Sequence, residues 1–384
     1  MTARVIPSRA VLSCALLLAL GACSTLGTPA SPPGPLPHGG TGQFRDLSSQ
    51  ETGLAPMAAG ITLVAGSGFA VDDVMPFRGD LFYAGAPSAP RGDAGTMDDA
   101  GAPSDAGVPR DAALDANVDA GPEPIDAVDW SRYQGRRILR SPRSEEWGFQ
   151  RGTEVFTASE PWEGGYVTDP WVVAHPDGRL LMFYAAAGGI GVASATSVEG
   201  PWTRVGTSPV LGAMGGAVPR RPSVVVTRDM PEVGAAFLMY YELEGTLRLA
   251  RSDDGTSFTD AGALDVPPIA QRDDRDGNEI SIGGPGAIVV VTPAGRSVLR
   301  VYYESRRDNG TVLIGMLGTS DGPTLEQYPL PMFSGRDRQR PAPRYVDQRV
   351  TLLYTWAPRG QTGQAMVSIT PAGTRLNDVA PPAL

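Results

Sequence analysis

One short pattern recurs five times along this chain of 384 residues and constrains its fold more than any other feature. Each copy has a polar residue, usually followed by a proline, then an apolar run, a turn and a second apolar run rich in aromatic residues. The proline, or the residue in its place, stands at 73, 170, 222, 285 and 341, so the copies are 97, 52, 63 and 56 residues apart. Repeats of short strands at this spacing are typical of propeller blades. We therefore predict an all-β fold, a five-bladed β-propeller with four-stranded antiparallel blades.

The first spacing is longer than the others because of a segment of unusual composition. Residues 86–128 are almost wholly Ala, Asp, Gly, Pro and Ser, and residues 91–126 contain nine acidic residues and two arginines, a net charge of −7. Such a segment has too few apolar side chains to offset the entropy of ordering it. We predict a disordered acidic insertion within the first blade, between its second and third strands. A solvated surface insertion is favoured over a segment that binds a ligand or partner.

The N-terminal residues have the features of an export signal. Arg4 and Arg9 precede an apolar stretch at 11–20, which is too short to span a membrane. The stretch ends in Leu20-Gly21-Ala22-Cys23, which resembles the lipobox of bacterial lipoproteins. The resemblance implies a signal peptide at 1–22, lipidation of Cys23 and, because Ser24 rather than aspartate follows, anchoring in the outer membrane. Residues 23–55 then form a flexible tether and residues 56–384 the propeller.

Charge and histidine content exclude several classes of function. The formal net charge is −10, and removal of 1–22 with its two arginines makes it −12, which argues against binding nucleic acid. The two histidines, His38 and His175, give no basis for a zinc site or for Ser-His catalysis. Residues 273–279 form an oxygen-rich loop that is the one candidate for calcium, but its spacing departs from the EF-hand template. We expect no cofactor.

The innermost strand of each propeller blade lines a central funnel, and the repeated pattern is our candidate for that strand. A residue before proline favours an extended backbone. We therefore expect the residues before the marker positions to lie extended and to ring one mouth of the funnel. These residues are Asp72, Asp169, Arg221, Gly284 and Arg340.

The segment 168–173, with 182–185, 190–194 and 200–202, resembles the five-bladed propellers of glycoside hydrolase families 43 and 32. In family 43, three successive blades supply an Asp base, an Asp that tunes the acid and a Glu acid. The resemblance places Asp72 at the base and Asp169 at the tuning position. Arg221 stands where the family has its Glu, and arginine is not a proton donor. Glu163 and Glu279 are the alternative acids.

We therefore predict a funnel that binds glycan without hydrolysing it. Trp162 and Tyr166 stand near Asp169 in the sequence, and aromatic rings beside polar groups suit sugars. The expected substrate-binding residues are Arg221, Arg340, Trp162, Tyr166, Glu163 and Glu279. Three alternatives remain: a hydrolase of the family 43 or 32 kind, a phosphorylase resembling those of family 130 with arginines holding phosphate, and a scaffold that binds protein partners. We expect a monomer.

The lipidation hypothesis is tested by replacing Cys23 with alanine. The parent protein is expected to partition with membranes and into detergent, whereas Cys23→Ala is expected to be released, because the diacylglycerol anchor is lost. Cys14→Ala is the matched control, since Cys14 lies within the predicted signal and its replacement leaves the anchor in place. Membrane partitioning of Cys23→Ala equal to that of the parent would contradict the hypothesis.

Overall fold

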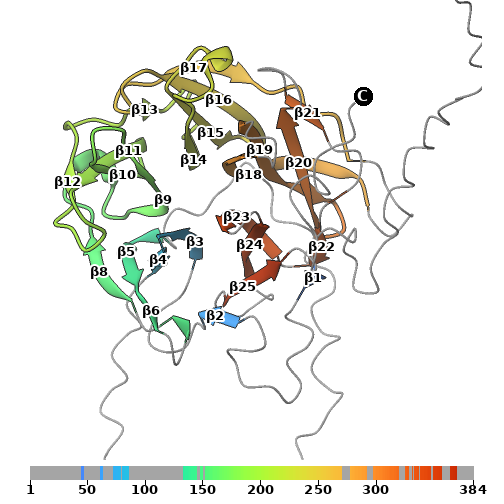
Figure 1. Cartoon of the computed structure of the whole chain (residues 1–384), viewed down its shortest axis with the longest axis horizontal. Coiled ribbons are helices and arrows are strands. Elements are labelled where there is room, and N and C mark those ends of the chain that lie inside the picture. The colour runs from blue at the N-terminus through green and yellow to red at the C-terminus, as the bar shows by residue number, and fades with distance from the viewer. Residues whose placement is uncertain are drawn as a thin grey trace, which may run out of the picture. The chain divides into compact units, whose positions relative to one another are not determined.

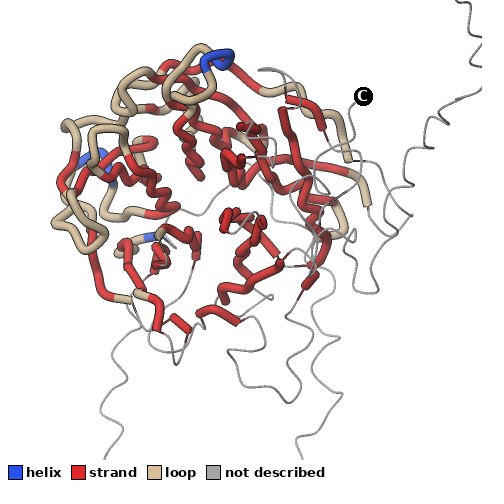
Figure 2. Tube along the Cα trace, viewed as in Figure 1, coloured by secondary structure: helices blue, strands red, loops and turns tan. Residues whose placement is uncertain are grey.

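The computed structural model describes 45–46, 61–63, 72–78, 80–85, 133–144, 148–149, 152–269, 277–291, 297–319, 325–327, 331, 333–336, 338–346, 349–356 and 364–369. All of these residues lie in the second of the chain's two units, Pro33–Leu384. Their regular structure is almost entirely strand, with helical residues confined to short turns such as Pro161–Glu163 and Pro231–Val233 (Figure 2). The prediction of an all-β fold is confirmed. None of the described helices is long and apolar enough to span a membrane.

Five antiparallel sheets of four or five strands make up most of the described structure. From the innermost strand outward, the first sheet contains β3 (Asp72–Phe77), β4 (Asp80–Gly85), β5 (Arg137–Ser141) and β8 (Thr153–Phe156), and the second contains β9 (Thr168–Ala174), β10 (Leu180–Ala186), β11 (Gly189–Ala195) and β12 (Thr203–Arg204), with β13 (Leu211–Gly212) also paired to β11. The third sheet contains β14 (Arg220–Val226), β15 (Phe237–Leu243), β16 (Thr246–Ser252) and β17 (Thr259–Ala263), and the fourth contains β18 (Glu279–Val291), β19 (Ser297–Arg307), β20 (Thr311–Thr319) and β21 (Leu325–Gln327), with β22 (Phe333–Arg336) also paired to β20. The fifth sheet contains β23 (Arg338–Val346), β24 (Arg349–Trp356), β25 (Gln364–Ile369) and β1 (Arg45–Asp46), with β2 (Ile61–Leu63) also paired to β25. A separate hairpin pairs β6 (Arg143–Ser144) with β7 (Gly148–Phe149).

The sheets are arranged around a common axis as propeller blades. Each inner strand contacts the next in a closed circuit that runs β3, β9, β14, β18, β23 and back to β3. Figure 1 shows these strands nearest the centre, with the later strands of each sheet farther out. The prediction of a propeller with antiparallel four-stranded blades is confirmed, and the repeated sequence pattern forms the first two strands of each sheet.

The core consists of apolar layers between neighbouring sheets. All seven residues of β10 are buried, as are all seven of β15, because both faces of these second strands are covered by adjacent sheets. This explains why the second apolar run of each copy is continuous rather than alternating. The aromatic pairs that mark these runs are fully buried, among them Phe183 and Tyr184 in β10 and Tyr302 and Tyr303 in β19. Burying each such side chain contributes about 2 kcal/mol.

The last sheet takes strands from both ends of the described chain. β24 pairs with β25, and the outer edge of β25 pairs with the N-terminal strands β1 and β2. β1 therefore lies inside the range 23–55 that we assigned to the tether. The remaining residues of that range, and the signal at 1–22, lie outside the described residues.

Residues 86–136 connect β4 to β5, which are neighbours in the first sheet. The two strands pair from Leu81 with Ser141 to Gly85 with Arg137. The predicted insertion at 86–128 thus joins two strand ends that the sheet already brings together. The insertion itself lies outside the described residues.

Deletion of residues 88–126 is expected to leave the fold intact, because β4 and β5 pair directly and the remaining residues suffice to connect them. The midpoint of thermal unfolding should stay within about 5 °C of the parent, a difference that corresponds to 1–2 kcal/mol for a domain of this size. The measurement is a thermal melt followed by circular dichroism. A loss of cooperative unfolding would mean that the segment contributes to the blade.

Candidate functional site at the mouth of the propeller

A β-bulge interrupts each inner strand at the position of the repeated pattern. In β14, Arg220 pairs with Glu242 and Ser223 with Tyr240, so two residues, Arg221 and Pro222, lie opposite one. The same break occurs in β3, β9, β18 and β23. An extra residue of this kind bends the strand and redirects its side chain.

The residues at the bulges do not have the extended backbone that we expected. Their φ angles are 51° at Asp169, 54° at Arg221, 52° at Gly284 and 62° at Arg340, all in the left-handed region. The expectation from the following proline was wrong, because the bulge imposes its own geometry on the residue before it. A left-handed conformation costs a non-glycine residue about 1 kcal/mol, so other interactions must hold these residues in place.

In the first sheet, the register corrects the position assigned to Asp72. Asp72 pairs with Ala84 and Met75 with Phe82, which leaves Asp73 and Val74 at the bulge. Asp73, not Asp72, is therefore equivalent to Asp169 and Arg221. The error arose because this copy lacks the proline that marks the position in the others. The side chains of Asp72 and Asp73 lie outside the described part of the structure.

Three carboxylates hold the bulges by accepting hydrogen bonds from the backbone. Asp169 Oδ2 accepts from Arg221 N at 3.2 Å, Glu242 Oε2 from Gly284 N at 3.0 Å, and Glu304 Oε1 from Arg340 N at 2.5 Å. In each case the carboxylate belongs to one sheet and the N–H to the next around the ring. These charge-assisted bonds join neighbouring sheets and offset the strain of the left-handed residues.

Four arginines neutralise the same carboxylates. Glu242 and Glu304 have no exposed side-chain surface. Arg306 bonds to both, at 2.7 to 3.1 Å, and Arg221 Nη1 lies 2.8 Å from Glu242 and 3.3 Å from Glu304. Arg220 Nη2 lies 2.6 Å from Glu242 Oε1, and the Arg340 guanidinium pairs with Asp169. The mouth thus holds a network of three acids and four arginines, which we call the mouth cluster.

Burial and charge act in opposite directions on the titration of the mouth cluster. Burial raises the pKa of Asp169 and of Glu304, against the opposing charge of Arg221. Burial also works to raise the pKa of Glu242, but the charges of Arg221 and Arg220 outweigh it and the pKa is lowered. For Arg221, burial works to lower the pKa, but Glu242 and Glu304 reverse this and raise it. The three acids therefore differ, with Glu242 the most firmly ionised.

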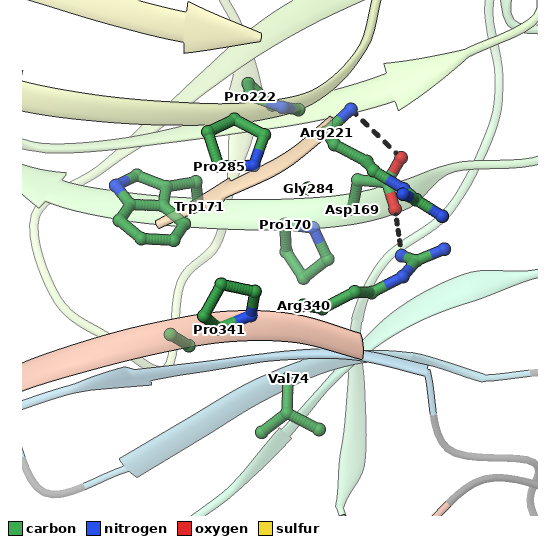
Figure 3. Close-up of a pocket in the computed structure, with 11 residues that line it drawn as sticks. Val74, Asp169, Pro170, Trp171, Arg221, Pro222, Gly284, Pro285, Arg340 and Pro341 are labelled. Atoms are coloured by element: carbon green, nitrogen blue, oxygen red, sulfur yellow. Dashed lines mark hydrogen bonds and ion pairs between the residues drawn. The ribbon is translucent and has the colours of Figure 1, made fainter. Parts of the chain in front are cut away.

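A small cavity adjoins the mouth cluster, and Asp169, Arg221 and Arg340 form part of its wall. It has a volume of about 30 Å³ and its walls include one proline from each of four sheets, Pro170, Pro222, Pro285 and Pro341, together with Val74 and Trp171. Figure 3 shows these prolines grouped on one side of Asp169, while the guanidinium groups of Arg221 and Arg340 extend on the other. Trp171 is fixed by a hydrogen bond from Nε1 to the carbonyl oxygen of Val224 at 2.8 Å.

The structure separates Glu163 and Trp162 from the mouth cluster. Glu163 accepts hydrogen bonds from the backbone of Ser159 and Glu160, from Tyr184 Oη at 2.8 Å and from Arg204 at 2.8 Å. Burial works to raise its pKa, but these hydrogen bonds, led by Arg204, lower it. Trp162 stacks on Tyr184, with ring centroids 6.0 Å apart. Glu163 and Trp162 therefore both contact Tyr184 of the second sheet, and the hydrogen bonds of Glu163 are all to residues outside the mouth cluster.

Tyr166 and Glu279 also have structural partners. Tyr166 is buried and packs against Tyr133, with centroids 5.7 Å apart; burial and the charge of Asp169 raise its pKa. Tyr166 is thus a buried neighbour of the mouth cluster. Glu279 accepts a hydrogen bond from Ser305 Oγ and lies 3.8 Å from Arg307. Of the predicted site residues, the structure brings together Asp169, Arg221 and Arg340.

Sequence reasoning missed Glu242, Glu304 and Arg306 as members of the site. A signal for the two acids is present, because Tyr-Tyr-Glu occurs at 240–242 and again at 302–304, at equivalent positions of successive copies. Acidic residues that recur inside buried strands require partners. The described residues contain no group of three potential metal ligands of the His, Cys, Asp or Glu type. Residues 271–276, which include most of the predicted calcium loop, lie outside the described residues.

The fold is that of known glycoside hydrolases. An endo-arabinase from Bacteroides thetaiotaomicron superposes with a TM-score of 0.50 and 13% identity over 80% of this chain and 96% of its own. A thermostable family-43 glycoside hydrolase gives 0.50 and 14% over 84% and 100%, and an endo-1,4-β-xylanase from Bacteroides thetaiotaomicron gives 0.50 and 12% over 78% and 90%. No protein-family model matches the sequence, and no curated protein matches it. At this identity the likeness establishes the propeller fold.

Replacement of Glu163 by glutamine is expected to destabilise the protein by about 2 kcal/mol, because the buried Glu163 carboxylate loses its charge and the half-buried Arg204 loses its ion-pair partner. Since the pKa of Glu163 is lowered by folding, its contribution is present above the pKa of the unfolded state and is lost as the pH falls through the folded value. The measurement is chemical denaturation of parent and variant at neutral and acidic pH. The two free energies of unfolding should differ at neutral pH and become equal at acidic pH.

Glu154→Gln is the matched control, because Glu154 forms an exposed ion pair with Arg137 and should contribute less than about 1 kcal/mol. An unchanged stability of Glu163→Gln at neutral pH would contradict the structural role and reopen Glu163 as a catalytic acid.

Proposed function

We propose that this protein is a five-bladed propeller of the glycoside hydrolase family 43 type whose mouth binds carbohydrate without hydrolysing it. The observation that carries the proposal is that all three acids at the mouth already have partners within the protein. Asp169, Glu242 and Glu304 are each engaged by an arginine and by a backbone N–H of the neighbouring sheet. The five sheets of the described residues support the assignment of five blades.

Hydrolysis of a glycosidic bond requires a carboxylic acid that protonates the leaving oxygen and a second carboxylate that acts as base or nucleophile. Arg221 stands at the position that corresponds to the acid in family 43, and arginine stays charged under all relevant conditions. Glu242 and Glu304 have no exposed side-chain surface, so neither can contact a sugar at the mouth without rearrangement. The site retains groups that can hold a sugar and lacks an available proton donor.

The mouth offers both kinds of surface that a sugar needs. The mouth cluster presents hydrogen-bonding groups, and the prolines and Trp171 beneath it present apolar surface. Sugars combine hydroxyl groups with apolar ring faces, so a site with both properties suits them. The cavity of about 30 Å³ accepts a substituent of the sugar, and the ring itself would lie above it.

A glycoside hydrolase is the second candidate, and two observations favour it. The solved structures that superpose on this chain carry names of arabinan-, xylan- and other glycan-cleaving enzymes. In addition, burial raises the pKa of Asp169 and Glu304, and a raised pKa is what a catalytic acid requires. In this alternative, rearrangement of the arginines on substrate binding would expose one of these acids.

We also propose that the propeller is held at the outer membrane by a lipid on Cys23. The support is the short apolar stretch that ends in Leu20-Gly21-Ala22-Cys23, and the absence of aspartate after the cysteine. The tether after Cys23 then leads to β1 and into the last sheet.

The two candidates are distinguished by screening a glycan array for binding and a panel of chromogenic arabinosides, xylosides and galactosides for turnover, with and without inorganic phosphate. We expect binding to at least one glycan, loss of that binding in Asp169→Ala by about tenfold or more, and no turnover, because general acid catalysis alone contributes a hundredfold to ten-thousandfold. Asp177→Ala, at an exposed hairpin of the second sheet, is the matched control.

Each other outcome selects an alternative. Turnover that is abolished by Asp169→Ala or Glu304→Gln would establish a hydrolase, and turnover that depends on phosphate would establish a phosphorylase. Binding to no glycan would leave the propeller as a protein-binding scaffold.

A further inference from the structure

The mouth cluster carries more positive than negative charge. It contains four arginines (Arg220, Arg221, Arg306 and Arg340) and three carboxylates (Asp169, Glu242 and Glu304), so its formal charge is 4 − 3 = +1. The whole chain has a formal charge of −10. This count covers the mouth cluster as defined and does not include Asp73 at the equivalent bulge of the first sheet, and it contrasts with the strongly acidic chain.

The arginines lie closer to solvent than the acids. The exposed fraction of the side chain is 11% for Arg221, 13% for Arg340 and 19% for Arg306, whereas Glu242 and Glu304 have none. Asp169 has an exposed fraction of 7%, so the arginines are the more exposed members of the mouth cluster.

From this arrangement we infer that the mouth recognises an acidic sugar, with the ligand's carboxylate held by Arg221 and Arg340. The inference rests on the proposed binding of carbohydrate and adds the class of sugar. Arginine presents a planar fork of donors that matches a carboxylate in two parallel hydrogen bonds, and such bonds are stronger than those between neutral groups.

The geometry of the two arginines supports this assignment. Arg221 and Arg340 come from β14 and β23, yet both bond to the carboxylate of Asp169, Arg221 through its backbone N–H and Arg340 through its guanidinium. Figure 3 shows the two guanidinium groups extending in the same direction past Asp169, away from the prolines. These two residues thus already hold one carboxylate between them, which shows that the pair suits this group.

Arg221 is not fully satisfied by the protein. Its Nε is buried and has no hydrogen-bond partner among the described residues, and its Nη1 is 3.3 Å from Glu304, a long contact for an ion pair. A buried donor without a partner costs about 1–3 kcal/mol. A small movement of Arg221 toward an incoming carboxylate would recover part of this cost.

The test is calorimetric titration of the full chain with trigalacturonic acid and with the same trisaccharide after reduction of its carboxyl groups. We expect the acidic trisaccharide to bind at least about tenfold more tightly, since one charged hydrogen bond is worth 1.5–3 kcal/mol and 1.4 kcal/mol is a factor of ten. The difference should shrink at high salt, because the interaction is electrostatic. Arg340→Gln should remove the preference, and Arg340→Lys should retain part of it.

Arg179→Gln is the matched control, because Arg179 lies on an exposed hairpin and pairs with Asp177. Thermal melts show whether each variant is folded. If Arg340→Gln does not fold, the partial loss of preference expected for Arg340→Lys is the test. Equal binding of acidic and reduced trisaccharides would overturn the inference and leave the proposed carbohydrate binding intact. Inorganic phosphate that binds as tightly as the acidic trisaccharide would also overturn it, because the site would then select an anion rather than a sugar. Binding of neither trisaccharide to the parent, with no other glycan bound, would contradict the proposed function itself.

Discussion

The hydrogen bond from a bulge N–H to a carboxylate of the preceding sheet is the interaction on which the centre of this structure depends. It occurs between Asp169 and Arg221, between Glu242 and Gly284, and between Glu304 and Arg340. Each bond holds a left-handed residue in place and joins two sheets at the axis. Because the acids are buried, they require cations, and the arginines of the mouth cluster follow from that requirement. Architecture and the chemistry of the mouth thus have the same origin.

This dependence also bears on the proposed binding of carbohydrate without hydrolysis. A catalytic carboxyl must exchange a proton with substrate, whereas a carboxylate that holds a bulge must remain ionised and bonded. Glu242 fulfils the second condition, since Arg221 and Arg220 lower its pKa. Asp169, Glu242 and Glu304 all hold neighbouring sheets together through bulge N–H groups. What remains accessible is the outward side of the arginines.

The architecture could be predicted from the sequence because the repeat is local. Continuous apolar runs that contain a pair of aromatic residues, as at Phe183-Tyr184 and Tyr302-Tyr303, predict the second strand of a sheet. The site could be predicted only in part. The one-residue error at Asp72 arose because strand register depends on the partner strand, and the copy has no proline to mark it. Glu163 was misjudged although the spacing Glu160 to Glu163 is a local capping signal, which the structure shows to be formed. The roles of Glu242 and Glu304 depend on arginines from other sheets, and no local pattern reveals such long-range pairing.

The pairing of β1 with β25 sets a condition on how the chain reaches this state. Arg45 pairs with Ile369, so this contact closes a loop of 369 − 45 = 324 residues. Contacts of such long range form late, because the entropy of loop closure is lost before the contact stabilises anything. Until β25 has been synthesised, the N-terminal strands β1 and β2 have no partner and the last sheet is incomplete. The ring therefore closes fully only when both ends of the described chain are available to pair with each other.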